Sequence, residues 1–225
     1  MISIARKRWY FFWQLLPLLG CGLFMVLYFI ATQYYPGGNY LNKSSGGFSW
    51  SQNYWCNLLS DTAINGRHNA AQPIAFAAMG VLSLTLVIFW FTFPVRADLR
   101  RGTRRLIQAS GFLAMTIGAF LFTGLHDTII NVAGGFGLIA LAGTLIGLKK
   151  LGWTRLLYMG LLVLVLIGLN NLLYYGNNLM YYLPVVQKIT FLYFLLWICL
   201  INLRWIRVAN NATVATVTGK VYIPT

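Results

Sequence analysis

Six stretches of about 20 mostly apolar residues, separated by short polar or basic segments, dominate this sequence of 225 residues. They cover residues 9–32, 71–94, 105–125, 128–148, 154–175 and 184–205. A helix of about 20 apolar residues crosses the hydrocarbon core of a bilayer, and a helix satisfies its own backbone hydrogen bonds there. The sequence therefore predicts an all-α, polytopic bundle of six transmembrane helices.

The composition excludes the main alternatives to a membrane protein. Hydrophobic residues make up 59% of the chain and charged residues only 9%, whereas roughly a quarter of an average soluble domain is charged. Such a chain cannot cover a soluble enzyme with polar groups, and it is too apolar and aromatic to be disordered. Cys21, Cys56 and Cys199 have no metal-binding spacing, so we expect no disulfide framework.

The basic residues are distributed unequally between the two sides of the predicted bundle. The net charge is +14, from seventeen Lys and Arg against three Asp. Fourteen of the basic residues fall on the same side as the N-terminus: Arg6, Lys7, Arg8, Arg96, Arg100, Arg101, Arg104, Arg105, Lys149, Lys150, Arg155, Arg204, Arg207 and Lys220. Lys43, Arg67 and Lys188 fall on the other. Because cytoplasmic loops are enriched in Lys and Arg, both termini are predicted to be cytoplasmic, in a bacterial inner (plasma) membrane, and no nucleic-acid partner is expected.

The connection between the first two predicted spans is the longest in the chain. Residues 33–70 are rich in Gly, Asn, Ser and aromatic residues. Trp50, Tyr54 and Trp55 are suited to the membrane interface, so we expect an ordered cap over the outer mouth of the bundle. The predicted organisation is a six-span domain at residues 1–208 followed by a cytoplasmic tail at 209–225. Val and Thr alternate in that tail, which is compatible with a short strand or a mobile segment.

Polar residues within or beside the spans concentrate toward the outer side. Polar groups in a membrane are costly, so each is a candidate for function. The candidates for ligand binding are Asp61, His68, His126, Asp127, Asn131, Asn170, Asn171 and Lys188. Gln187 lies at the same depth, whereas Asn202 is the main polar residue of the inner half. This asymmetry predicts a polar pocket on the outer face.

Three interpretations of this cluster stay open. In the first it is structural: Asp127 caps a helix start, Lys188 extends to the interface, and the asparagines bind neighbouring helices. In the second it is a shallow lipid or small-ligand site, where Lys188 meets an anionic group and the asparagines donate hydrogen bonds.

The third interpretation is a metal-dependent hydrolase. His68, His126, Asp61 and Asp127 are types of residue that hold zinc and thereby activate water. No pair of histidines has the H-x-x-x-H spacing of a helical metal site.

The fourth predicted span is rich in small residues. Gly143 and Gly147 are one helical turn apart, and a small face lets another helix backbone approach closely. We therefore expect this helix to lie centrally in the bundle; the alternative is that its small face forms a dimer interface.

The segment NYWCNLLSDTAINGRHNAAQPIAFAAMG resembles uncharacterised bacterial multi-span membrane proteins of the domain-of-unknown-function family numbered 998. The resemblance rests on an aromatic-rich loop after the first span and on Ser60, Asp61, Asn69 and Pro73. The sequence departs from the family pattern where Asn69 is followed by Ala70 and not by Pro. The resemblance implies a six-helix layout similar to the eukaryotic DRAM-like proteins, whose loose association with lipid handling is an analogy, and it implies no reaction.

From these features we expect an integral membrane protein that binds a membrane lipid or a membrane-protein partner in the outer polar pocket. We expect binding and not catalysis, without a cofactor. The alternative is a hydrolase of outer-leaflet lipid that uses zinc.

Overall fold

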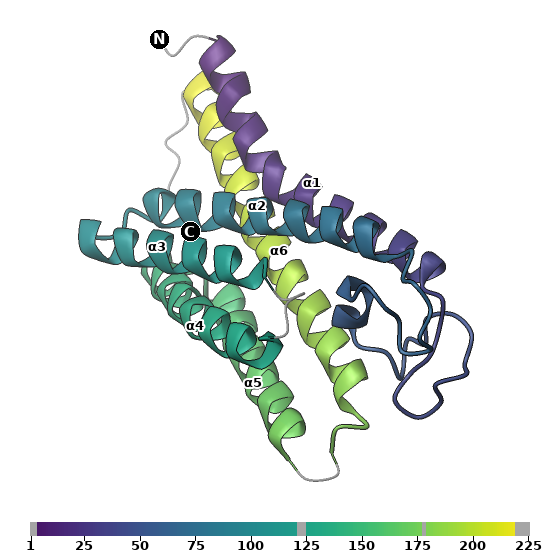
Figure 1. Ribbon diagram of the computed structural model, residues 1–225. Helices are drawn as coiled ribbons and strands as arrows, with labels where there is room; N and C mark the ends of the chain where they lie inside the picture. The colour runs from purple at the N-terminus through teal and green to yellow at the C-terminus, as the bar shows by residue number, and fades with distance from the viewer. Residues whose placement is uncertain (1–3, 121–124, 177–178, 219–225) are drawn as a thin grey trace.

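In the computed structural model, the described residues 4–120, 125–176 and 179–218 form α-helices joined by loops (Figure 1). The side chains of residues 4–14, 126, 210 and 212–218 are not described. The helices are α1 (Ile4–Tyr34), α2 (Gln72–Arg96), α3 (Arg101–Gly118), α4 (His126–Lys150), α5 (Thr154–Tyr175) and α6 (Leu183–Thr218), with a short 3₁₀ helix, η1 (Trp55–Leu59). The predicted all-α class is confirmed for the described part of the chain.

Five of the described helices are long and apolar enough to cross a membrane. These spans are Leu15–Tyr34, Gln72–Arg96, Asp127–Lys150, Thr154–Tyr175 and Leu183–Ala209. The third predicted span, at residues 105–125, differs: the helix runs from Arg101 to Gly118, and residues 121–124 lie outside the description. Three arginines in its first two turns make α3 less apolar than the other helices, so it is not one of the five.

Local chemistry explains where α2 and α4 end. Asp98 follows α2 with a φ of 46°, a left-handed conformation that Asp tolerates better than most residues. Gly152 follows α4 with a φ of 67°, as is common just past a helix C-terminus. At both residues the positive φ turns the chain, so that the next helix can run back along the previous one.

Helix α3 runs antiparallel to both of its neighbours. Along α4, Ile107 packs at Gly143 and Ala114 lies beside Gly137. Along α2, the Gln108 amide donates to the Phe91 carbonyl at 3.0 Å. Farther along α3, a methyl group added at Gly111 would collide with Trp90 of α2. Residue numbers therefore rise along α3 as those of the contacting residues fall along α2 and α4, which shows that α3 is antiparallel to both.

Glycines in α4 allow this close packing. A methyl group added at Gly143 would collide with Ile107 of α3, and one added at Gly147 would lie 2.6 Å from the Phe93 ring of α2. Side chains of neighbouring helices therefore fill the space at Gly143 and Gly147. The expectation that this helix lies centrally in the bundle stays a prediction.

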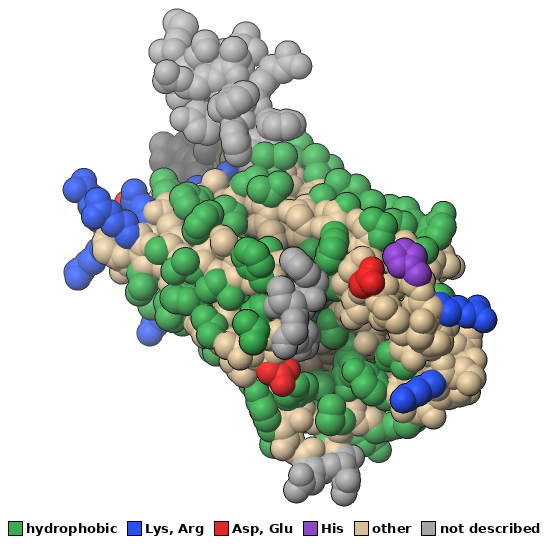
Figure 2. Space-filling model, viewed as in Figure 1, with side chains coloured by type: hydrophobic (Ala, Val, Ile, Leu, Met, Phe, Trp, Pro, Cys, Tyr) green, Lys and Arg blue, Asp and Glu red, His purple; other side chains and the backbone are tan. Residues whose placement is uncertain are grey.

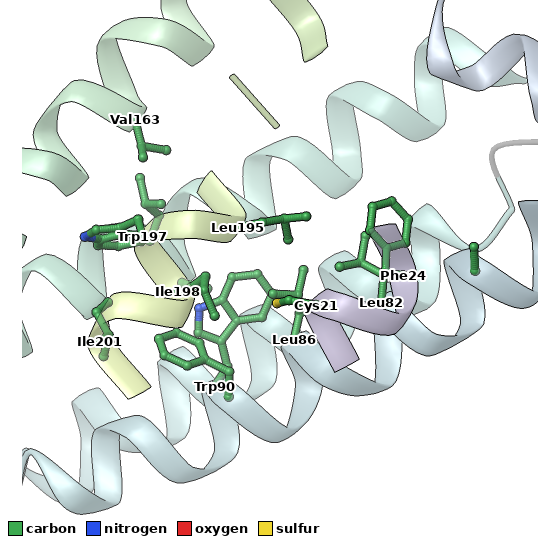
Figure 3. Close-up of a cluster of buried hydrophobic side chains, with 14 of the residues drawn as sticks. Cys21, Phe24, Leu82, Leu86, Trp90, Val163, Leu195, Trp197, Ile198 and Ile201 are labelled. Carbon is green, nitrogen blue, oxygen red and sulfur yellow. The ribbon is translucent and has the colours of Figure 1, made fainter. Parts of the chain in front are cut away.

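The hydrophobic core contains buried residues of α1 to α6 and of η1. Figure 3 shows the part of it that joins α1, α2, α5 and α6. Phe24, Trp90 and Ile198 are buried in it, and the Trp197 indole donates to the Leu156 carbonyl at 2.7 Å. The Cys21 thiol of α1 interacts with Cys199 of α6, yet all three cysteines are free. The expectation of no disulfide framework is confirmed.

Basic side chains lie around the α2–α3 and α4–α5 turns and on the part of α6 beside them. We call this end of the molecule the basic end. Lys150 Nζ lies 3.3 Å from Asp98 Oδ2, and the Arg204 guanidinium lies 5.1 Å from the Trp153 ring centroid. Figure 2 shows basic side chains at the left, beside the α2–α3 connection, and many apolar side chains over the middle of the molecule. The α1–α2 connection lies at the opposite end, which we call the cap end.

Helix α6 continues past the predicted start of the tail. Its backbone is helical to Thr218, so the boundary expected at residue 208 is not a helix end and the described part of the tail is not a strand. Extending an existing helix adds a hydrogen bond for each residue fixed, and Ala209, Ala212 and Ala215 favour helix strongly. Residues 219–225 lie outside the description.

Candidate functional site

The cap segment, residues 35–71, is held together by buried asparagines. Asn69 is fully buried. Its amide donates to the carbonyls of Asn57, Leu58 and Ser60 at 3.2, 3.3 and 2.7 Å, and its Oδ1 accepts from the Ala71 backbone. Asn69 therefore connects η1 to the start of α2, which gives a physical role to one position of the sequence motif.

Lys188 of α6 attaches the cap segment to the helices. Its side chain is 6% exposed, and its ammonium donates to the carbonyls of Asn53 and Pro184 at 2.5 and 2.8 Å. The ammonium also lies 5.6 Å from the centroid of the Phe48 ring. On the next turn of the cap, the Trp55 backbone N–H donates to Gln187 Oε1 at 3.3 Å.

Burial also changes the chemistry of the cap segment. It raises the pKa of the Cys56 thiol in η1 to about 11, so this thiol is protonated and weakly nucleophilic at neutral pH. Burial likewise raises the pKa of Tyr40 and Tyr54.

Asp61 and His68 form a separate pair on the cap surface. Asp61 Oδ1 lies 3.8 Å from His68 Nδ1, and both side chains are more than three-quarters exposed. Among the described residues, no group of three or more His, Cys, Asp or Glu side chains could hold a metal ion. The side chain of His126 lies outside the description, so the four-residue metal site stays a prediction.

A polar pocket of about 380 Å³ lies between the cap segment and the ends of α4, α5 and α6. Four of the eight predicted site residues line it: Asp127, Asn131, Asn170 and Asn171. Asp61, His68 and Lys188 do not line it. The structure thus brings half of the candidates together and assigns the other described ones to contacts within the cap segment or between it and α6.

Tyrosines of α5 complete the polar pocket. The Tyr174 hydroxyl donates to Asp127 Oδ1 at 2.7 Å, and the Asn131 amide donates to the Tyr175 hydroxyl at 3.1 Å. The Asn170 amide donates to Thr190 Oγ1 of α6 at 2.6 Å. Sequence reasoning missed these tyrosines, although each follows a candidate asparagine by four residues and so shares its helix face.

An apolar cavity of about 520 Å³ adjoins the polar pocket, lined by residues of α2, α3, α4, α5 and α6. Ile130, Asn131 and Asn171 line both spaces, so the two lie side by side. The wall from α4 contains Gly134 and Gly135, where an added methyl group would meet no atom of the described residues within 4 Å. The glycines of α4 therefore differ along its length: Gly143 and Gly147 are filled by neighbouring helices, whereas Gly134 and Gly135 face open space.

These features define a class of protein: over the described residues, an all-α fold with five helices long and apolar enough to cross a membrane, and a polar pocket beside an apolar cavity. No protein family, curated protein or solved structure matches the chain. The resemblance to the family numbered 998 therefore stays a prediction.

Proposed function

We propose that this chain is an integral membrane protein that binds one amphiphilic lipid in the polar pocket and the apolar cavity together. The observation that carries this proposal is that the two spaces lie side by side and share Ile130, Asn131 and Asn171 in their linings. A lipid has the same division into a polar head and an apolar chain. Both volumes also fall in the range of roughly 300–1,000 Å³ typical of small-molecule sites.

The proposed topology has six crossings, with α3 as the third. Its 18 residues extend about 27 Å at ~1.5 Å per residue, close to a hydrocarbon core of about 30 Å. Its arginines lie near its start at the basic end, and its contacts run antiparallel to α2 and α4. A crossing by α3 leaves both termini at the basic end, which the excess of Lys and Arg assigns to the cytoplasm.

Cysteine labelling tests this topology. In a chain with the three native cysteines replaced by alanine, we expect a membrane-impermeant maleimide to label Lys43→Cys on intact cells. Arg101→Cys should be labelled only after the membrane is permeabilised, because it lies at the basic end. Equal labelling of both variants on intact cells would contradict the orientation.

The native cysteine of the cap segment provides an internal control. Because the pKa of Cys56 is raised from the ordinary value of 9.0 to about 11, at pH 8 it holds about a hundredfold less thiolate than an ordinary cysteine. Unmodified protein should therefore react slowly from outside, and its labelling rate should keep rising above pH 9, where an ordinary thiol approaches its maximum.

Filling the apolar cavity tests the proposed site. We expect Gly135→Leu to reduce the lipid that co-purifies with the protein by at least about tenfold, because the new side chain enters open space that the lipid chain would occupy. The bound lipid is counted by native mass spectrometry in a neutral detergent.

Gly168→Leu is the matched control, since this α5 glycine also has no atom within 4 Å of an added methyl group but lines neither space. It should retain lipid as the unmodified chain does. Gly134→Leu is an independent filling variant, and apparent melting temperatures report whether each variant folds. Full lipid retention in both folded filling variants would overturn the proposal.

A further inference from the structure

The apolar cavity extends along the helices that line it. Over the described residues, its lining begins near the cap end at Met79 of α2 and Ile130 of α4, and it ends toward the basic end at Trp90 and Leu141 of the same helices. In both helices the first and last lining residues are about three turns apart, which is roughly 16 Å along the axis at ~1.5 Å per residue. The two helices therefore give the cavity the same length.

The limit of the cavity toward the basic end, which we call the floor, consists of packed side chains. Trp90 of α2 is 3% exposed and fills the space at Gly111 of α3, and the lining of α3 starts three residues later, at Ala114. Ile107 of α3 fills the space at Gly143 of α4, just past the last lining residue of that helix. On these three helices, close packing begins where the cavity ends.

The walls formed by α5 and α6 end in the same way. Leu145 of α4 and Trp197 of α6 fill the space at Gly160 of α5. The lining of α5 begins three residues later, at Val163, and that of α6 ends at Phe194, one turn before Trp197. Val163 and Trp197 are buried in the hydrophobic core (Figure 3). A ligand chain that reached farther would therefore have to displace core side chains.

The dimensions of the cavity limit the alkyl chain that it holds. An apolar cavity of about 150 Å³ binds one benzene molecule, so about 520 Å³ holds roughly 20 carbon atoms. Three bonds of an extended polypeptide span ~3.3–3.6 Å, or about 1.2 Å per bond, so a depth of roughly 16 Å corresponds to about 12–14 carbons. One extended chain of that length fits in this volume, whereas two would exceed it.

The other end of the cavity fixes where such a chain begins. Asn131 and Asn171 line the cavity there and also line the polar pocket. A head group held in the polar pocket places the first carbons of its chain at this level. The distance from these asparagines to the floor then determines how much of the chain is accommodated.

We infer that the occupant is a single-chain amphiphile whose extended alkyl chain of about 12–14 carbons ends at the floor, so that the protein selects its ligand by chain length. This inference rests on the proposed function, because it assumes that head group and chain occupy the two spaces. A longer chain overpacks the floor, and a shorter one leaves a void whose lining loses contacts.

A competition within one sample tests this selection. Saturated 1-monoacylglycerols with chains of ten, twelve, fourteen, sixteen and eighteen carbons are mixed in equal amounts with the whole protein in one neutral detergent. Native mass spectrometry identifies the bound species by mass. We expect the highest occupancy for twelve or fourteen carbons and at least about fivefold less for eighteen. Equal occupancy across the series, or a maximum at eighteen carbons, would overturn the selection by length.

Variants at the floor should change the preferred length. Leu141→Ala removes three carbons from a side chain that is 3% exposed and lines the cavity at the floor, so we expect the preferred chain to lengthen by about two carbons. Val163→Ala is a smaller change on α5 and should shift the preference in the same direction, with less risk to folding. An unchanged preference in both folded variants would contradict the role of the floor.

Leu148→Ala is the matched control. This α4 leucine is also buried, but it lies beyond the floor and lines neither space. The preferred chain length should therefore stay the same in this variant. A shift as large as that of Leu141→Ala would mean that the preference does not depend on the floor, and would overturn the inference.

The outcomes separate this inference from the proposed function. Occupancy that is independent of chain length but is lost in Gly135→Leu would overturn the selection by length and leave the lipid site intact. Equal occupancy of every probe in the unmodified chain and in a folded Gly135→Leu would overturn both.

Discussion

Replacing Asn69 with alanine should lower the free energy of unfolding by roughly 2–4 kcal/mol and release the cap segment from α2. The Asn69 amide is fully buried and donates to three carbonyls of residues 57, 58 and 60. Alanine leaves these carbonyls without that donor in a site that water does not reach. We expect an apparent melting temperature lower by about 4–16 °C and faster hydrogen exchange of the η1 amides.

Two further variants identify the cause of this loss. Asn69→Asp keeps the size of the side chain but removes both amide hydrogens, so it should be at least as destabilising as alanine. Asn42→Ala removes one exposed hydrogen bond, to the Ser44 backbone at 2.9 Å, and should change stability by less than about 0.5 kcal/mol. A melting temperature unchanged by Asn69→Ala would contradict the proposed role of this residue in the cap segment.

The sequence was sufficient to predict the long apolar helices. A single apolar stretch in a membrane can satisfy its backbone N–H and C=O groups internally only by forming a helix. The sequence also identified Gly143 and Gly147 as a small helix face, at which neighbouring helices pack, whereas the central position expected for this helix stays a prediction. It did not predict the bounds of α3, where arginines extend the helix toward its start, or the helical backbone beyond Ala209. At the start of α3 the charged composition, and beyond Ala209 the alternation of Val and Thr, did not indicate helix. In both regions the helix nevertheless extends, because adding a residue to an existing turn costs less than starting a new one.

The polar pocket was predictable only in part. The sequence indicates how far each residue lies from the end of its predicted span, but it does not indicate which neighbouring helix or loop the side chain faces. Asp127, Asn131, Asn170 and Asn171 share one depth and also face one space. Lys188 has the same depth, but its ammonium binds the Asn53 carbonyl beneath the cap segment, in a loop whose path the sequence does not reveal. The open space beside Gly134 and Gly135 was equally hidden, since small residues in a sequence look alike whether or not a neighbour fills them.

Because a neighbouring helix fills the space at Gly143 but not at Gly134, the same substitution should affect stability differently at these two positions of α4. Gly143→Ala should destabilise the protein by roughly 1–3 kcal/mol, because its methyl group would collide with Ile107 in a packed interface. Gly134→Ala makes the same chemical change on the same helix, at a position where no atom of the described part of the chain lies within 4 Å of the added methyl group. It should be neutral or stabilise by up to about 1 kcal/mol through helix propensity.

The comparison is made by measuring the apparent melting temperatures of the two variants in one detergent. Because both variants replace Gly with Ala, the substitution changes the unfolded chain in the same way in each. A decrease for Gly143→Ala together with no decrease for Gly134→Ala supports both the α3–α4 contact and the open wall of the apolar cavity. Equal decreases would mean that a neighbouring helix also fills the space at Gly134, and the cavity would then have no room for a lipid chain. Stability measured without any ligand therefore tests the space on which the proposed function depends.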